Sequence, residues 1–381
     1  MESTGVQERM LNTSEHIPSW QIHPSTSINN AGLLDLSTVC PMQGAISLYI
    51  DRSPNFFKLY ELFDPGGEVW IAERGGNLDG CLGVIHDSVV LGGERLKAAY
   101  FRDFKISPQL RGGTLAVRLV RAAIQCEEAR GTNCALVSIL DGNEKSLVFT
   151  SGRAGIPRAI SLGRVRYYSI PPLWRRRIPR GIAVKPWDDS LWPEVRSFLP
   201  RAWARYAFAP ADPCVLFQTI KSLPGLLPSD ILTAWRGDRL CGILASWDHE
   251  SSMRYVVTNL TKRLRVLCNA ARLFGRILPI TASPRMGHPL RYRFVLLALV
   301  ENEDEDIMRA MLARLHNDMI GGPWSHFSLC LHERDGLNRA LNGLAISSVA
   351  SNVFLFPNRE DNTRWSSLSG KLIYPGAATY L

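Results

Sequence analysis

The spacing of apolar and polar positions divides the chain into two stretches that follow one plan: an apolar strand pair, a long strand, a helix and a further strand. In the first stretch this spacing predicts helices at 56–63, 114–130 and 143–152. It predicts single strands at 68–74, 96–107, 134–140 and 167–170, and a pair of strands within 78–93. In the second it predicts helices within 190–203 and at 306–319, and strands at 230–237, 240–248, 293–300, 326–333 and 351–357.

Antiparallel strands followed by strand, helix and strand are typical of a mixed α/β sheet, so we expect an α/β protein of two such domains. Residues 1–32 are polar and rich in Ser, Asn, Pro and His, which favours a flexible or loosely docked arm. A first domain then covers 33–170, a basic linker rich in Pro and Arg covers 171–181, and the second domain covers 182–381.

Composition is that of a globular protein, with 46% hydrophobic and 21% charged residues. The net charge of +9 favours anionic ligands or partners without naming them. Eight cysteines are scattered with no C-x-x-C spacing, so we expect reduced thiols and no metal site. The N-terminal residues lack the apolar core of a signal peptide, and the longest apolar run, 294–300, is too short to span a membrane. These features predict a cytoplasmic protein with no membrane span.

The turn between strand 96–107 and helix 114–130 carries the clearest chemistry, because it reads Arg111-Gly112-Gly113. A helix start leaves backbone N–H groups unpaired and partly positive, which suits a phosphate group. Glycines let a ligand approach the main chain closely, and arginine adds a charged fork of donors. The alternative is an ordinary strand–turn–helix connection, and the sequence that follows favours the phosphate site.

Taken together with the residues downstream of this turn, residues 36–170 resemble the GNAT family of acyl-CoA-dependent N-acyltransferases. Residues 180–360 resemble the family only in outline. The motif is Arg111 to Ala116 after Ile106-Ser107-Pro108, with an Asn143-led helix downstream and a family-like opening at 41–57. The resemblance implies a tandem GNAT-like fold and transfer of acetyl or another acyl group from acyl-CoA to a small-molecule or peptide amine by direct attack. It places cofactor binding at Ile106, Arg111, Gly112, Gly113, Thr114, Leu115, Ala116 and Asn143.

Two departures bear on catalysis. Thr114 stands where the family most often has Gly, although its N–H is still available. Thr150 stands where the family often has a tyrosine general acid, so Tyr167 or Tyr168 on the next strand is the expected substitute. Asp103 is the expected general base, with a solvated or salt-bridged strand residue beside Arg102 as the alternative. Glu144 is a weaker candidate, since a first-turn acid also stabilises a helix dipole.

The second domain gives a contrasting signal. Five carboxylates within 301–306 occupy the turn equivalent to 111–113, and they would repel a pyrophosphate. We therefore expect a degenerate second domain that does not bind coenzyme A there, and that is structural or forms one wall of the acceptor pocket.

Several alternatives stay open. The chain is either the transferase or a degenerate acyl-CoA-binding scaffold or sensor, an alternative supported by Thr150. A nucleic-acid-binding role, based on the net charge of +9 and the cluster Arg175–Arg177, ranks last, because no aromatic-interleaved strand motif accompanies them. The basic stretch 261–276 is either a helix for a membrane surface or, as we expect, a surface helix with its apolar face buried. The acceptor, the acyl length and the oligomeric state are not predicted.

Overall fold

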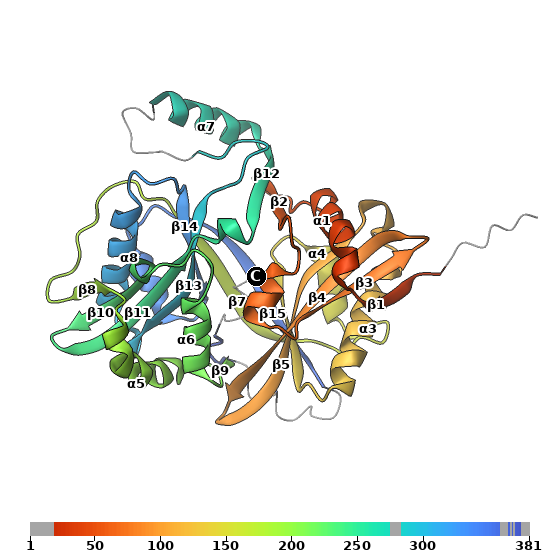
Figure 1. Ribbon diagram of the computed structural model, residues 1–381, viewed down its shortest axis with the longest axis horizontal. Helices are drawn as coiled ribbons and strands as arrows, with labels where there is room; N and C mark the ends of the chain where they lie inside the picture. Colours follow the sequence, from red (N-terminus) through yellow and green to blue (C-terminus); the bar gives the residue numbers. More distant parts are fainter. Residues whose placement is uncertain (1–18, 275–282, 359–364, 366–367, 369, 375–381) are drawn as a thin grey trace, which may run out of the picture.

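The computed structural model describes residues 19–274, 283–358, 365, 368 and 370–374. It confirms the predicted α/β class. Its main sheet has 13 strands in the order β1-β3-β4-β5-β6-β15-β7-β14-β13-β11-β10-β8, with β9 beside β4, and a separate two-stranded sheet pairs β2 with β12. Figure 1 shows the two halves side by side, with β7 and β15 between them and the small sheet β2–β12 above.

The elements of the first half are β1 (Gln21–Pro24), α1 (Asn30–Val39), β2 (Ile46–Asp51), α2 (Lys58–Phe63), β3 (Glu68–Arg74), β4 (Asn77–Leu91), β5 (Glu94–Ile106), α3 (Leu115–Ala129), β6 (Cys134–Leu140), α4 (Glu144–Leu147) and β7 (Ile160–Ile170). The strand pair predicted within 78–93 is wrong, because β4 is one long strand and the turn comes at Gly92 and Gly93, both with positive φ. Part of the expected arm is ordered, since β1 pairs with β3 and α1 begins at Asn30.

The elements of the second half are β8 (Ala183–Pro186), α5 (Trp192–Trp203), β9 (Ala209–Pro210), α6 (Pro213–Lys221), β10 (Ile231–Arg236), β11 (Arg239–Trp247), β12 (Arg254–Leu260), α7 (Lys262–Phe274), β13 (Tyr292–Val300), α8 (Glu305–Met319), β14 (His326–His332) and β15 (Ser347–Pro357). No described helix is long and apolar enough to cross a membrane.

The two halves complete each other's sheets by exchanging their last strands. β15, from the end of the chain, inserts between β6 and β7 of the first half, and it pairs antiparallel with both. In turn β7 pairs antiparallel with β14 of the second half. One apolar core therefore joins strands of the first half to α5 and α6 of the second, with Tyr100, Phe198, Phe217 and Leu355 among its members.

Each half contains one parallel strand pair that separates at a β-bulge. β5 pairs with β6 only from Ala98 to Phe101, and the register of β5 against β4 slips immediately beyond, at Asp103 and Phe104. In the second half β13 pairs with β14 only from Tyr292 to Val295, and a register shift follows at once. Because a bulge bends its strand, the C-terminal ends of both parallel pairs diverge.

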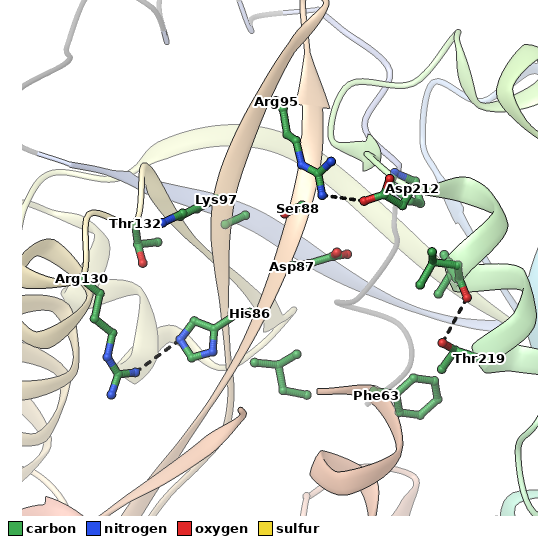
Figure 2. A pocket seen from close by; sticks show the side chains of 15 residues that line it. Phe63, His86, Asp87, Ser88, Arg95, Lys97, Arg130, Thr132, Asp212 and Thr219 are labelled. Atoms are coloured by element: carbon green, nitrogen blue, oxygen red, sulfur yellow. Dashed lines mark hydrogen bonds and ion pairs between the residues drawn. The ribbon is translucent and has the colours of Figure 1, made fainter. Parts of the chain in front are cut away.

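A cavity of about 550 Å³ lies at the N-terminal end of β5, between β4 and α6. Figure 2 shows the side chains around it, with His86 on one side of β4 and Asp87 on the other. His86 Nδ1 lies 3.1 Å from Asp64 Oδ2, and its Nε2 lies 3.1 Å from Glu127 Oε1 of α3. Hydrogen bonds to these two carboxylates raise the pKa of His86 to about 9, so the imidazole is charged at neutral pH.

Replacing Leu355 with Ala should lower the free energy of unfolding by about 2–5 kcal/mol, because this fully buried side chain lies on the exchanged strand in the shared core. Val349→Ala on the same strand is the control, since Val349 is 55% exposed and should cost under about 1 kcal/mol. Urea unfolding measures both. Two separate transitions in the wild type would contradict the coupling of the halves.

The His86 cluster should make stability depend on pH at the alkaline side. The pKa of His86 is higher in the folded chain than the unfolded value of about 6.5, so its contribution is complete below pH 6.5 and is lost as pH rises through about 9. Between pH 6.5 and about 9, the unfolding free energy of the wild type should fall by about 2 kcal/mol more than that of His86→Gln. Denaturant unfolding at stepped pH measures this, with the exposed His288→Gln as control. Equal slopes for all three proteins would refute it.

Candidate functional site

The predicted phosphate turn lies exposed at the C-terminal end of β5. The N–H of Arg111 and the N–H of Gly113 each make one long bond within the turn, of 3.4 Å, to the carbonyls of Pro108 and Leu110. Among the described residues, the amides of Gly112, Thr114, Leu115 and Ala116 make no backbone hydrogen bond outside helix α3. Gly112 has φ +88° with open space where a Cβ would be, so the main chain can be approached closely there.

The start of α3 has no cap of its own. Thr114 is the N-cap, yet its side chain accepts no hydrogen bond from the helix amides, and the first turn contains no acidic residue. The partial positive charge of this helix start is therefore open to an anion. Arg111 is close by, with its Nε donating to the Ile106 carbonyl at 3.3 Å.

Three other residues that the resemblance assigns to cofactor binding do not have their side chains in the turn. The side chain of Ile106 is buried, and its carbonyl also accepts from Cys40 Sγ. Leu115 points into the core between α3 and the sheet, so only its amide faces the turn. Asn143 is exposed and precedes α4, its side chain making no cap bond. Because β5 and β6 are parallel, α3 and α4 both start at the same, divergent edge of the sheet.

The segment after β6 packs against β5 through two aromatic rings, Phe104 and Phe149, which meet edge to face with centroids 5.6 Å apart. Thr150 follows at the position where the family often has tyrosine, and its hydroxyl donates to the Leu147 carbonyl at 2.7 Å. Glu144 is exposed in the first turn of α4. None of these contacts brings an acid to the divergent strands.

Asp103 is the centre of a buried charge cluster. Its carboxylate accepts from Arg52 Nη1 at 2.7 Å and Nη2 at 3.0 Å, Arg102 Nε at 2.9 Å, Lys105 Nζ at 3.0 Å and the Tyr60 hydroxyl at 2.9 Å. Only 3% of the Asp103 side chain is exposed. Burial alone would raise the pKa of Asp103, but the charges of Arg102, Arg52 and Lys105 outweigh burial and hold it well below its usual range.

This cluster suits a structural role better than proton removal. A carboxylate with four partners and a lowered pKa is a weak proton acceptor at neutral pH. Asp103 has φ +49°, in the left-handed region that non-glycine residues rarely adopt, and it sits in the bulge. Opposite the bulge, a Cβ on Gly83 would lie 1.8 Å from the Tyr60 hydroxyl, so a glycine is needed for Tyr60 to reach Asp103.

Tyr167 and Tyr168 point to opposite faces of β7. The Tyr168 hydroxyl donates to Asn338 Oδ1 at 2.8 Å, on the face covered by α8. Tyr167 lies on the other face beside Cys330 of β14 and Ser138 of β6, the first residue of β6 beyond its pairing with β5. Burial raises the pKa of Tyr167, and Cys330 adds to this, so the phenol is protonated at neutral pH.

Sequence reasoning missed an aromatic cluster that adjoins Tyr167. Tyr255 of β12 and Tyr292 of β13 have ring centroids 5.6 Å apart, and Tyr292 stacks on His326 at 4.8 Å. Tyr255 also lies near Arg52 and Arg102, so the cluster runs from the bulge to Tyr167. Tyr167, Tyr255 and Tyr292 are partly solvent-exposed, although burial raises the pKa of each. Residues this far apart in the sequence carry no local signal of their meeting.

The equivalent turn in the second half is occupied by its own side chains. Asp304 caps α8 by accepting from the amides of Asp306 and Ile307 at 3.0 and 3.2 Å. Glu301 and Glu303 pair with Arg239 and Arg205. The start of α8 is therefore filled, whereas that of α3 is open.

No family model matches the sequence, and no curated protein matches it. Solved structures do. N-myristoyltransferase of Saccharomyces cerevisiae, solved with bound myristoyl-CoA, is 13% identical with a TM-score of 0.58, over 89% of this chain and 82% of that one. A GCN5-related N-acetyltransferase of Sphaerobacter thermophilus is 12% identical with a TM-score of 0.59, over 89% of this chain and 96% of that one.

A GCN5-related N-acetyltransferase of Anabaena variabilis is 11% identical with a TM-score of 0.50, over 88% of this chain and 72% of that one. These likenesses span both halves and establish the fold. They confirm the predicted resemblance: the chain has the GNAT fold in tandem, as N-myristoyltransferase does.

Proposed function

We propose that the protein is an N-acyltransferase that moves an acetyl or other acyl group from acyl-CoA to an amine acceptor. The observation that carries the proposal is the contrast between the two helix starts. The amides before and within the first turn of α3 are open and flanked by Arg111, whereas the side chain of Asp304 caps the start of α8. Only the first half can accept a pyrophosphate at this position.

The divergent ends of β5 and β6 would hold the pantetheine arm. Beyond Phe101 in β5 and Val137 in β6, the two strands no longer form backbone hydrogen bonds with each other. The main-chain groups on their facing edges can therefore bind an extended ligand. The turn Arg111–Ala116 and the exposed Asn143 flank this opening. We assign Asp103 to the bulge that creates it, as a positioning residue.

In this proposal Tyr167 is the general acid. The neutral amine nitrogen attacks the thioester carbon, the carbon–sulfur bond breaks, and the departing thiolate takes the phenolic proton of Tyr167. The proton lost by the amine then restores the phenol, so the net reaction gives amide and free thiol. Burial raises the pKa of Tyr167, so the phenol carries its proton at neutral pH when the reaction begins.

The acceptor would enter on the face that carries Tyr167, Tyr255 and Tyr292, because the partial exposure of these side chains shows that water reaches them. Strands of both halves meet there, so the second half would supply one wall of the acceptor site. A small-molecule or peptide amine is the proposed substrate class.

A second candidate is an acyl-CoA-binding protein without catalysis. Thr150 favours it, because its hydroxyl is bonded to Leu147 and supplies no acid. Free-thiol release with a panel of amines separates the two functions, since a binding protein shows a thermal shift with acyl-CoA but no turnover.

Replacing Arg111 with Glu should abolish the thermal shift given by acetyl-CoA and longer acyl-CoAs, because it puts a negative charge beside the phosphate. A ligand at about 100 times its Kd stabilises the wild type by about 2.7 kcal/mol, so the loss is measurable. Arg196→Glu, on the exposed side of α5, is the matched control and should keep the shift. A shift retained by Arg111→Glu would show that the phosphate site is wrongly placed.

Replacing Tyr167 with Phe should lower kcat about 10²- to 10⁴-fold while the acyl-CoA thermal shift is kept, because only the phenolic proton is lost. Tyr168→Phe on the opposite face is the control and should leave kcat within a few-fold. Thiol release at saturating acyl-CoA measures both. Equal effects of the two variants would remove Tyr167 from the mechanism.

A further inference from the structure

The positive charge of the chain is concentrated in one segment. Residues 251–300 contain nine basic and no acidic residues, which leaves 35 basic and 35 acidic residues in the rest of the chain. The whole net charge of +9 therefore comes from these 50 residues. The basic residues are Arg254, Lys262, Arg263, Arg265, Arg272, Arg276, Arg285, Arg291 and Arg293.

Some of these cations are neutralised inside the fold. Arg254, Arg291 and Arg293 pair with Asp51, Glu250 and Asp230. In the part of the chain that the structure describes, Lys262, Arg263, Arg265 and Arg285 form no ion pair. Their charge is therefore available to a partner.

These unpaired cations gather around α7. Figure 1 shows α7 projecting beyond both halves at the end of β12. Residues 287–290 lie beside β12, with the Gly287 N–H donating to the Val257 carbonyl at 2.8 Å, which places Arg285 and Met286 near the base of the helix. Met286 is 48% exposed.

The outer face of α7 combines charge with apolar surface. Lys262 and Arg263 lie one turn before Val266 and Leu267, so these four side chains share one side of the helix. Val266 is 67% exposed and Leu267 is 64% exposed, while Cys268 is buried. The expectation that the apolar face of this helix is buried is therefore wrong for Val266 and Leu267.

We propose that α7 docks the protein onto an anionic membrane surface, with Val266 and Leu267 entering the headgroup boundary and the surrounding cations contacting lipid phosphates and carboxylates. Adjacent exposed aliphatic side chains among lysine and arginine are the combination that interfacial helices use. The basic charge matches an anionic leaflet. A nucleic acid would use the cations but has no use for the aliphatic pair, so the membrane is the favoured partner.

Co-sedimentation of the full chain with vesicles tests this. We expect binding to phosphatidylcholine vesicles that contain about 30% phosphatidylserine, no binding to phosphatidylcholine alone, and loss of binding when salt rises from about 0.1 to 0.5 M. Arg263→Glu should weaken binding at least about fivefold, and Arg196→Glu on α5, an exposed arginine elsewhere, should not. Val266→Ser with Leu267→Ser should weaken it about tenfold or more, whereas Val215→Ser, equally exposed at 64% on α6, should not.

The variants change exposed side chains, so circular dichroism should show each one folded. Binding that is unaffected by the Val266 and Leu267 changes, or that is equal on neutral and anionic vesicles, would overturn the proposal. Binding to single-stranded RNA but to no vesicle would replace the membrane with a nucleic acid as the partner. Because acyl-CoA turnover is not the readout, failure of the proposed enzyme function leaves this test unaffected.

Discussion

The arrangement of the first half depends on one buried carboxylate. Asp103 sits in a β-bulge with a backbone conformation that non-glycine residues rarely adopt, and it is held there by two arginines, a lysine and a tyrosine. Removing a carboxylate from such a cluster leaves buried cations unpaired, which is far costlier than losing a surface ion pair. The bulge bends β5 away from β6, and the open edges of these strands are the surface where we propose that acyl-CoA binds. The charge cluster thus shapes the site without taking part in the proposed chemistry.

The exchange of β7 and β15 joins the strands of both halves into one sheet. Each half has a parallel strand pair that diverges at a register shift, yet neither sheet is complete without a strand of the other half. The shared core brings Tyr255 and Tyr292 of the second half next to Tyr167 of the first. The second half has a capped helix start in place of a phosphate turn, and in the proposed function it forms a wall of the acceptor site while the first half binds the donor.

Helix α7 lies at the far end of the small sheet β2–β12, apart from the proposed phosphate turn. The basic residues at the two places have different surroundings. Arg111 lies beside open backbone amides, as a phosphate ligand requires, whereas the cations of α7 lie beside exposed aliphatic side chains. Both sites are positively charged. The groups beside the charge, backbone amides at Arg111 and aliphatic side chains on α7, determine which anionic partner each site favours.

The sequence by itself determined many of the elements and the phosphate turn. Short runs of apolar residues placed β3 and β6 at their observed bounds, and two glycines after an arginine marked the open helix start, because both signals are local. The sequence did not determine that β4 is one strand, that Tyr167 and Tyr168 face different partners, or that Asp103 is enclosed by Arg52 and Tyr60, about 50 and 40 residues earlier. Only the tertiary structure decided these points, since they depend on strand pairing and on contacts between residues distant in the chain, which no local pattern records.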